Sequence, residues 1–130
     1  TIVSAYRDCR RCADVVVVEG VGGWLVPLTD RLTVADLAQA LGIPVLLVVG
    51  VRLGCINHAL LTALAMGASG ASCLGWVANV LDDEQYAVDE VIGSLEQRIS
   101  APLLGVIDTH DHQALDGVAH EIASRPYHDD

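Results

Sequence analysis

The sequence predicts an α/β domain with three layers, in which helices flank a central parallel sheet. Three observations support this prediction: short aliphatic runs recur along the chain, helical patterns separate them, and aromatic residues make up only 4% of the sequence. Continuous runs of Val, Leu and Ile are typical of strands that are buried on both faces. Alternation of strand and helix patterns predicts βαβ units with right-handed crossovers.

The first predicted elements lie in the N-terminal third. Residues 1–13 have helical spacing of apolar side chains, and Val15–Val18 predict the first buried strand. Thr33 is a suitable N-cap for a helix through Leu41, because a hydroxyl accepts a hydrogen bond from the first turn. Gly42 then favours the end of this helix.

The later elements continue the same alternation. Pro44 precedes a buried aliphatic run, Gly67 or Gly70 can end the following helix, and the acidic residues 82–84 favour the start of another. The predicted ranges are a strand over 45–49, a helix over 56–66, a strand over 73–79, a helix from 82–84 to about 100, a strand over 102–107 and a helix over 113–123.

Length and composition narrow the class of protein. A chain of 130 residues can form one domain, predicted over residues 1–125, followed by a frayed tail over 126–130. The net charge of −10 argues against binding to nucleic acid. Arg52 and Asn57 interrupt the longest apolar stretch, so no membrane span is predicted. Four unevenly spaced cysteines suggest reduced thiols and a cytoplasmic location.

The segment after the first predicted strand has the character of a ligand site. Glu19 follows the strand and is followed by Gly20, Gly22 and Gly23. Ligands of open α/β sheets bind at the carboxyl ends of the strands, and glycines let backbone N–H groups approach a ligand closely. A carboxylate at this position suits Mg²⁺ shared with a phosphate. The alternative is a tight turn with a solvated Glu19.

The usual phosphate-binding loops are missing from this sequence. It contains neither G-x-x-x-x-G-K-[ST] nor G-x-G-x-x-G after a strand, and it contains no lysine. Because the chain starts at Thr1 rather than at a methionine, we expect that sequence upstream of Thr1 is missing.

Four segments together resemble one family, dethiobiotin synthetase, in its C-terminal half. They are EGVGGWLVPL, PVLLVVGVRLGCINHALLTA, GWVANV and APLLGVI, and the similarity extends from about Asp14 to Ile107. The resemblance implies a P-loop NTPase-like fold, present here in part, and a homodimer. It also implies an ATP- and Mg²⁺-dependent ligase of biotin biosynthesis, which converts 7,8-diaminopelargonate and CO₂ into dethiobiotin. ATP phosphorylates a carbamate on one amine, and the second amine closes the ring.

The resemblance also assigns roles to residues near the substrate. Glu19 matches the catalytic acid that binds Mg²⁺ and the γ-phosphate, and Gly22 and Gly23 match the loop where phosphate and substrate meet. The segment that binds the substrate carboxylate, at the dimer interface, matches Gly54, Cys55, Ile56 and Asn57. A helix that starts near Cys55 would present free N–H groups to this carboxylate.

A second group of residues is assigned to the nucleotide. Asn79 matches the residue that reads the adenine edge, since an amide can both donate and accept hydrogen bonds. Pro102, Leu103 and Leu104 match the loop that packs beside the adenine. Tyr86 corresponds to a tyrosine that contacts the substrate.

Structural alternatives exist for three of these residues. Asn79 could cap the following helix, and Asn57 could satisfy a local backbone group. Cys55 has no base beside it in the sequence pattern, which favours a small buried residue over a nucleophile.

Two further motifs suggest metal sites that the rest of the chain does not support. Cys9 and Cys12 form a C-x-x-C, but a four-ligand zinc site needs a second pair. His110 and His112 end an apolar strand as in amidohydrolases, but that chemistry needs a β/α barrel, and too few residues follow. We therefore interpret both motifs as incidental, and a metal or redox role of Cys9 and Cys12 is the less favoured alternative.

The absence of a phosphate loop limits what this chain can do alone. Without its lysine and backbone donors, we expect no synthetase activity from the 130 residues. The alternative function is a non-catalytic dimerisation or carboxylate-binding module derived from the same fold. We also expect an open apolar edge beside Val15–Val18, which would make the chain oligomerise or aggregate.

Overall fold

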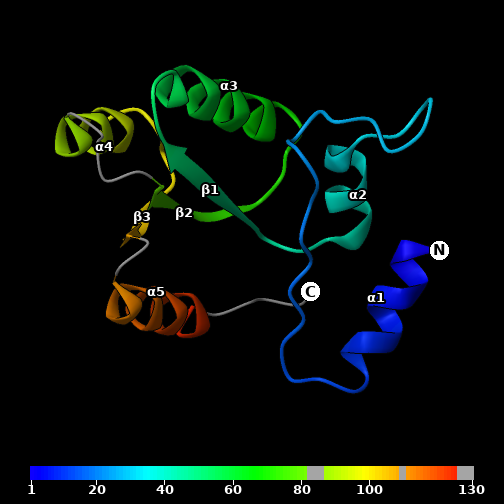
Figure 1. Ribbon diagram of the computed structural model, residues 1–130. Helices are drawn as coiled ribbons and strands as arrows, with labels where there is room; N and C mark the ends of the chain where they lie inside the picture. The colour runs from blue at the N-terminus through cyan, green and yellow to red at the C-terminus, as the bar shows by residue number, and fades with distance from the viewer. Residues whose placement is uncertain (82–86, 109–110, 126–130) are drawn as a thin grey trace.

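A three-stranded parallel sheet lies at the centre of the molecule (Figure 1). The computed structural model describes residues 1–81, 87–108 and 111–125. Within them, β1 spans Val45–Val51, β2 spans Cys73–Val80 and β3 spans Leu103–Asp108, in the order β1-β2-β3. All of these strands run parallel, which confirms the predicted sheet.

Helices cover both faces of this sheet. Along the described chain, the helices are α1 over Ile2–Arg10, α2 over Val34–Leu41, α3 over Cys55–Ala68, α4 over Val88–Glu96 and α5 over His112–Ala123, and α1 contributes no residue to the buried core. Helices α3 and α4 lie on one side of the sheet and α5 on the other, as Figure 1 shows. The predicted three-layer α/β fold is therefore confirmed.

The core follows from the alternation of side chains along β2. Trp76 and Ala78 are fully buried on the face covered by α3 and α4. Val77 points to the other face, where it packs with Leu104 of β3 and Val118 of α5. Because successive strand residues point to opposite faces, this central strand is buried on both sides.

Helix α2 begins and ends where the sequence predicts. The Thr33 hydroxyl accepts a hydrogen bond from the Asp36 backbone N–H at 3.3 Å, and the Asp36 carboxylate accepts one from the Thr33 N–H at 2.7 Å. This reciprocal pair is a capping box. Gly42 has a φ of 67°, a left-handed conformation that glycine adopts without strain. Local chemistry therefore marks both ends of α2.

The other predicted elements are found with shifted ends. Strands β1, β2 and β3 and helices α3 and α5 overlap the predicted ranges. Helix α4 ends at Glu96, several residues before the predicted end near residue 100. The acidic residues 82–84, which predicted its start, and the tail over 126–130 lie outside the described residues.

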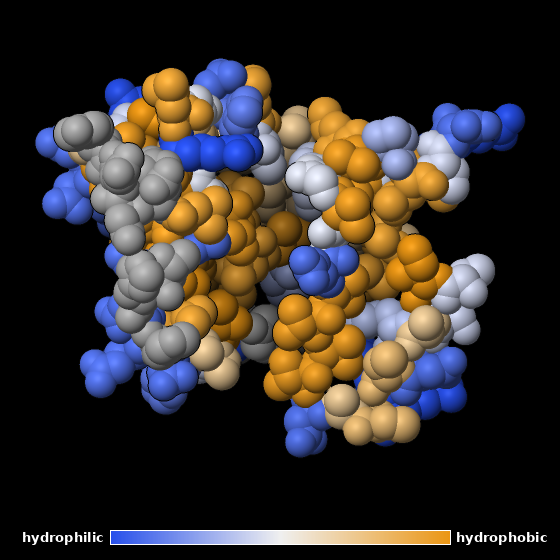
Figure 2. All heavy atoms as spheres, in the orientation of Figure 1, coloured by the Kyte–Doolittle hydropathy of each residue, from blue (hydrophilic) through white to orange (hydrophobic). Residues whose placement is uncertain are grey.

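The predicted strand Val15–Val18 is wrong for this structure. The segment has no strand partner among the described residues, and Val15 and Val17 are 70% and 86% exposed. Figure 2 shows apolar side chains at the surface along the segment that follows α1. A β-branched run favours an extended backbone, but a strand also needs a neighbour that supplies hydrogen bonds. Among the described residues, strand β1 lies at the edge of the sheet and pairs with β2.

Candidate functional site

The start of α3 lies directly beyond the carboxyl end of β1. Gly54 is its N-cap, with a left-handed φ of 88°, and no side chain caps the helix. The Cys55 N–H donates to the Arg52 carbonyl at 3.0 Å, which closes the turn between strand and helix. The Ile56 and Asn57 amides of the first turn thus belong to a helix N-terminus without a side-chain cap. Such amides favour an anion.

Asn79 lies near the same edge of the sheet. It is the penultimate residue of β2, and its Cα partners are Gly50 of β1 and Ile107 of β3. Its half-buried side chain shares the strand face of Val77, two residues earlier, which is the face covered by α5. Asn79 and the start of α3 therefore share the carboxyl end of the sheet, but the Asn79 side chain lies on the face opposite α3.

Pro102, Leu103 and Leu104 lie at the amino end of β3, which is the opposite end of the sheet from Asn79. The Pro102 carbonyl accepts a hydrogen bond from the Trp76 N–H at 2.9 Å, and Leu103 is the Cα partner of Trp76. Asn79 is three residues further along β2, roughly 10 Å away at the usual rise of a strand. The structure therefore does not bring these three residues together with Asn79.

The register instead places Ile107 and Asp108 beside the end of β2. Ile107 is the Cα partner of Asn79, and Asp108 is that of Val80. The sequence reasoning missed these two as site residues. The available signal was their position at the end of a predicted strand, where ligands of parallel sheets bind.

The glycine loop, residues 20–26, is held by hydrogen bonds to the start of α2. The Trp24 carbonyl accepts a hydrogen bond from Ala35 N–H at 2.9 Å, and the Val26 carbonyl accepts one from Val34 N–H at 3.0 Å. Gly22 has a φ of 77°, a conformation that disfavours any side chain. These hydrogen bonds therefore hold the glycine loop in a defined conformation against α2.

This loop is anchored near the amino end of the sheet. Trp24 is buried in a cluster with Ala35 and Met66, and this cluster packs against Val45 and Cys73, the first residues of β1 and β2. The seven residues of β1 span about 20 Å, which separates this anchor from the start of α3. Gly22 and Gly23 are therefore not brought together with Gly54–Asn57.

Glu19 is exposed, in the segment that leads into the glycine loop. Its neighbour Gly20 lies close to α2, since a Cβ there would be 3.4 Å from Val34 Cγ1. The described residues contain no group of three or more His, Cys, Asp and Glu placed to hold a metal ion. Glu19 can thus offer one carboxylate, and other metal ligands would have to come from a bound molecule.

Two cysteines of the core have no partner that would activate them. Cys55 is buried with a free thiol, as expected for a small core residue. Burial raises the pKa of the Cys73 thiol, although a contact with the Gly75 carbonyl opposes the shift. Neither has the features of a nucleophile at neutral pH.

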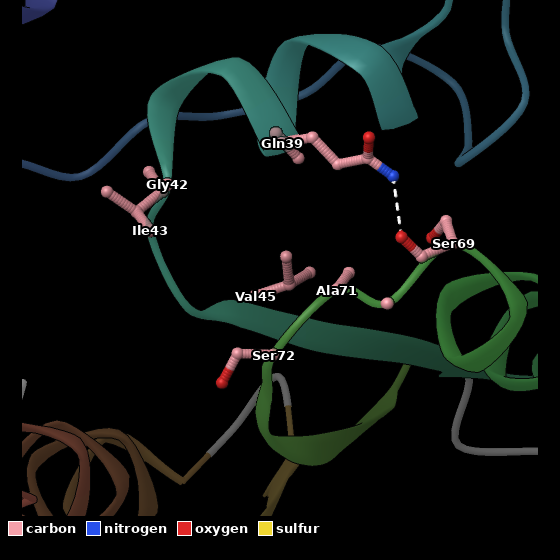
Figure 3. Close-up of a pocket in the computed structure, with 9 residues that line it drawn as sticks. Gln39, Gly42, Ile43, Val45, Ser69, Ala71 and Ser72 are labelled. Atoms are coloured by element: carbon pink, nitrogen blue, oxygen red, sulfur yellow. Dashed lines mark hydrogen bonds between the residues drawn. The ribbon is translucent and has the colours of Figure 1, made fainter.

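A cavity of about 380 Å³ lies between α2 and the connection from α3 to β2 (Figure 3). The Gln39 side chain bridges it by donating a hydrogen bond from Nε2 to the Ser69 carbonyl at 2.7 Å. Val45, the first residue of β1, also lines it. The cavity is therefore at the amino end of the sheet, away from the start of α3.

Some predicted residues cannot be placed. Tyr86 and His110 lie outside the described residues, and only the backbone of His112 is described. In the described part of the chain, no helix is long and apolar enough to span a membrane.

Comparison with known proteins identifies the family. Residues 2–113 match the family model described as an AAA domain, and the chain belongs to this family. Together with the parallel sheet, the match confirms the predicted P-loop NTPase-like fold.

Several curated proteins that the chain resembles carry the name ATP-dependent dethiobiotin synthetase BioD. The chain is 56% identical over 106 residues to the ATP-dependent dethiobiotin synthetase BioD of Xanthomonas oryzae pv. oryzae, covering 82% of this chain and 47% of that protein. The Aromatoleum aromaticum protein of that name gives the same values. The Xanthomonas campestris pv. campestris protein is 49% identical over 118 residues, covering 91% and 53%. The chain spans about half the length of these relatives, and the resemblance is confirmed.

Proposed function

We propose that this chain is the substrate-binding part of an ATP- and Mg²⁺-dependent dethiobiotin synthetase that acts in the cytoplasm. Its reaction would join CO₂ to 7,8-diaminopelargonate and close the ring. The observation that carries the proposal is the 56% identity to proteins of this name over 82% of the chain. The arrangement of the sheet supports it, because the start of α3 and Asn79 both lie at the carboxyl end of the strands, where ligands of parallel sheets bind.

The start of α3 would bind the carboxylate of the substrate. Gly54 leaves space, since nothing lies within 4 Å of where its Cβ would be. The Cys55 N–H is bonded to the Arg52 carbonyl, so the backbone amides of Ile56 and Asn57 are the ones that would attract a negative charge at this helix N-terminus. The exposed Asn57 side chain can add a polar contact.

Asn79 would recognise the adenine edge. Its position at the carboxyl end of β2 supports this role, and Ile107 and Asp108 are the β3 residues beside it. The resemblance assigns the adenine loop to Pro102, Leu103 and Leu104, which lie at the amino end of β3. We therefore propose Ile107 and Asp108 as better candidates for the neighbours of the base. Tyr86 is proposed as a substrate contact from the resemblance alone.

Glu19 would hold Mg²⁺ together with phosphate oxygens of ATP. One carboxylate with phosphates and water is the usual environment of Mg²⁺, so an isolated Glu19 fits this role. The metal ion would neutralise negative charge on the phosphates. Gly22 and Gly23 would lie beside the phosphates, and the Gly23 N–H, which donates to the Val21 carbonyl at 3.0 Å, would have to leave this bond to contact them. This function requires the glycine loop and α3 to meet, and therefore a rearrangement of the N-terminal segment.

A second copy of the chain would cover the outer face of α3. Leu61 and Leu64 are 57% and 71% exposed, one turn apart on this helix, and Leu53 before it is fully exposed. Apolar side chains gathered in this way favour a homodimer. Leu61→Glu with Leu64→Glu should give monomers in analytical ultracentrifugation, whereas Leu115→Glu on α5 should not. A monomeric parent chain would contradict the dimer.

We expect no synthetase activity from these 130 residues alone. The sequence contains no lysine and no phosphate-binding loop to position a triphosphate. The alternative proposal is a non-catalytic dimerisation or carboxylate-binding module. The observation that favours it is that the start of α3 is formed while Glu19 lies in an unpaired segment.

Calorimetric titration separates the two proposals. MgATP binding that is lost in Asn79→Ala and in Glu19→Ala would support the nucleotide site. Binding of 7,8-diaminopelargonate without nucleotide binding would support the module, and Asn57→Ala should then weaken it. Leu115→Ala on α5 is the matched control and should leave both titrations unchanged. Silence with both ligands would contradict both proposals for the isolated chain.

A further inference from the structure

The end of α1 places two thiols on one turn. Beyond the helix, the Arg11 N–H donates to the Asp8 carbonyl at 3.2 Å and the Cys12 N–H donates to the Cys9 carbonyl at 3.0 Å. Both bonds join residues three apart, which is the pattern of a 3₁₀ turn. Side chains three apart eclipse one another in such a turn. Cys9 and Cys12 therefore project from the same side of the chain.

The spacing of this turn suits a disulfide bond. A turn closed by a bond between residues three apart keeps their Cα atoms within about 7 Å. Disulfides form at Cα separations of roughly 4.4–6.8 Å. Both thiols are free and both residues are exposed, so a small reagent can reach them. Helix α1 contributes no residue to the buried core, so small adjustments of its last turn disturb little packing.

The surroundings are unusually basic for this chain. Arg7, Arg10 and Arg11 are three of its seven basic residues, and they flank the two cysteines. Arg11 lies 3.8 Å from the Asp8 carboxylate, and Arg10 lies over the Tyr6 ring at 6.0 Å. A local positive charge on a protein of net charge −10 attracts an anionic reagent to this place.

We propose that Cys9 and Cys12 form a reversible redox site, which closes to a disulfide on reaction with an anionic low-molecular-weight disulfide such as oxidised glutathione. One thiolate attacks a glutathione sulfur, which breaks the glutathione disulfide, releases one glutathione thiolate and leaves a mixed disulfide. The second thiolate attacks the protein sulfur and releases the second glutathione. The two cysteines together lose two protons and two electrons, and the electrons reduce glutathione disulfide to two thiols.

The remaining two cysteines provide an internal comparison. Cys55 is 4% exposed at the start of α3. Cys73 is half-buried at the start of β2, where burial raises the pKa of its thiol. Access and thiolate character decide which cysteines react, so both should remain reduced under native conditions.

Peptide mapping tests the proposal directly. The reduced chain is equilibrated with glutathione mixtures under native conditions, alkylated and digested with trypsin, which cuts after Arg10 and Arg11 between the two cysteines. The expected product is residues 8–10 joined to residues 12–31 until a reductant is added. Cys12→Ser should instead hold glutathione on Cys9, at a level about tenfold above the parent chain, because no second thiol resolves the mixed disulfide. Cys73→Ser is the matched control and should give the joined peptide unchanged.

Three outcomes would overturn the proposal. Both cysteines could be recovered alkylated in oxidised glutathione, both could retain glutathione in the parent chain, or the joined peptides could come only from dimers linked between chains. Circular dichroism of Cys12→Ser verifies that the variant remains folded. The readout does not depend on ligand binding or on synthetase activity.

Discussion

Two valines of this protein lie in very different environments. Val77 lies in β2 between two neighbouring strands and is 1% exposed, whereas Val17 lies in the segment after α1 and is 86% exposed. Valine favours an extended backbone at both positions. The difference between them is the neighbouring strand, which supplies hydrogen bonds to one and not to the other. The strands of the sheet are therefore paired with one another, whereas Val15–Val18 have no partner strand among the described residues.

The candidate site is divided in the same way. The start of α3 and Asn79 share the carboxyl edge of the sheet. The glycine loop is anchored through Trp24 at the amino end. Half of the proposed site thus depends on packing within the described fold, and the other half depends on a rearrangement of the N-terminal segment.

Matched valine substitutions should show the largest difference between the regions. Val77→Ala removes two methyl groups from a packed core and should lower the free energy of unfolding by about 2–3 kcal/mol. Val17→Ala should change it by less than about 0.5 kcal/mol, because the side chain is exposed. Urea unfolding followed by circular dichroism measures both. Equal losses of stability in the two variants would mean that Val17 is buried in solution. The two regions would then not differ in burial.

Matched glycine substitutions sharpen the comparison. A Cβ at Gly75 of β2 would lie 2.6 Å from Cγ of the buried Leu104, so Gly75→Ala should cost about 1–3 kcal/mol of stability. Nothing lies within 4 Å of the same position at Gly23, so Gly23→Ala should be nearly neutral. Thermal unfolding of the two variants provides the measurement. A neutral Gly75→Ala would contradict the close packing of β2 against β3.

The smallest expected effect is in the capping box of α2. Hydrogen bonds from the Thr33 backbone and then from its hydroxyl lower the pKa of the Asp36 carboxyl from its ordinary value of 3.8. A lowered pKa in the folded state means that this stabilisation is present above pH 3.8 and is lost as the pH falls through the lower, folded value. Asp36→Asn should therefore lose the part of the acid dependence that comes from this group.

Thermal unfolding between about pH 5 and pH 2 measures this effect. The parent chain should lose stability relative to Asp36→Asn as the pH falls. A difference in thermal stability between the two proteins that stays constant over this pH range would show that the Asp36 carboxylate does not contribute to the acid dependence of stability. Glu96→Gln, at the far end of α4, is a control for the removal of one negative charge.

Local chemistry explains which elements the sequence could predict. The Thr33 hydroxyl, the Asp36 carboxylate and Gly42 mark the ends of α2 within a few residues of the chain, so these ends could be located from the sequence. Strands β1 and β2 were also predictable, because each has an aliphatic run that finds partners within the described chain. Val15–Val18 was wrong because no sequence pattern states whether a partner strand is present.

The site was predictable only in part for a similar reason. Gly54 before α3 and Asn79 at the end of β2 could be located from strand and helix patterns. The distance of Leu103 from Asn79 depends on the register between β2 and β3, which the sequence does not contain. The contact of Trp24 with Met66 likewise joins residues far apart along the chain. Such contacts need the fold.

Hydrogen–deuterium exchange tests the division of the molecule most directly. The amides of β2 from Val77 to Val80 should exchange slowly, because strands on both sides bond to them. The amides of Val15–Val18 should exchange at nearly the rate of an unfolded chain. Protection of Val15–Val18 equal to that of β2 would show that this segment is a paired strand. It would contradict the distinction between the paired sheet and the unpaired N-terminal segment.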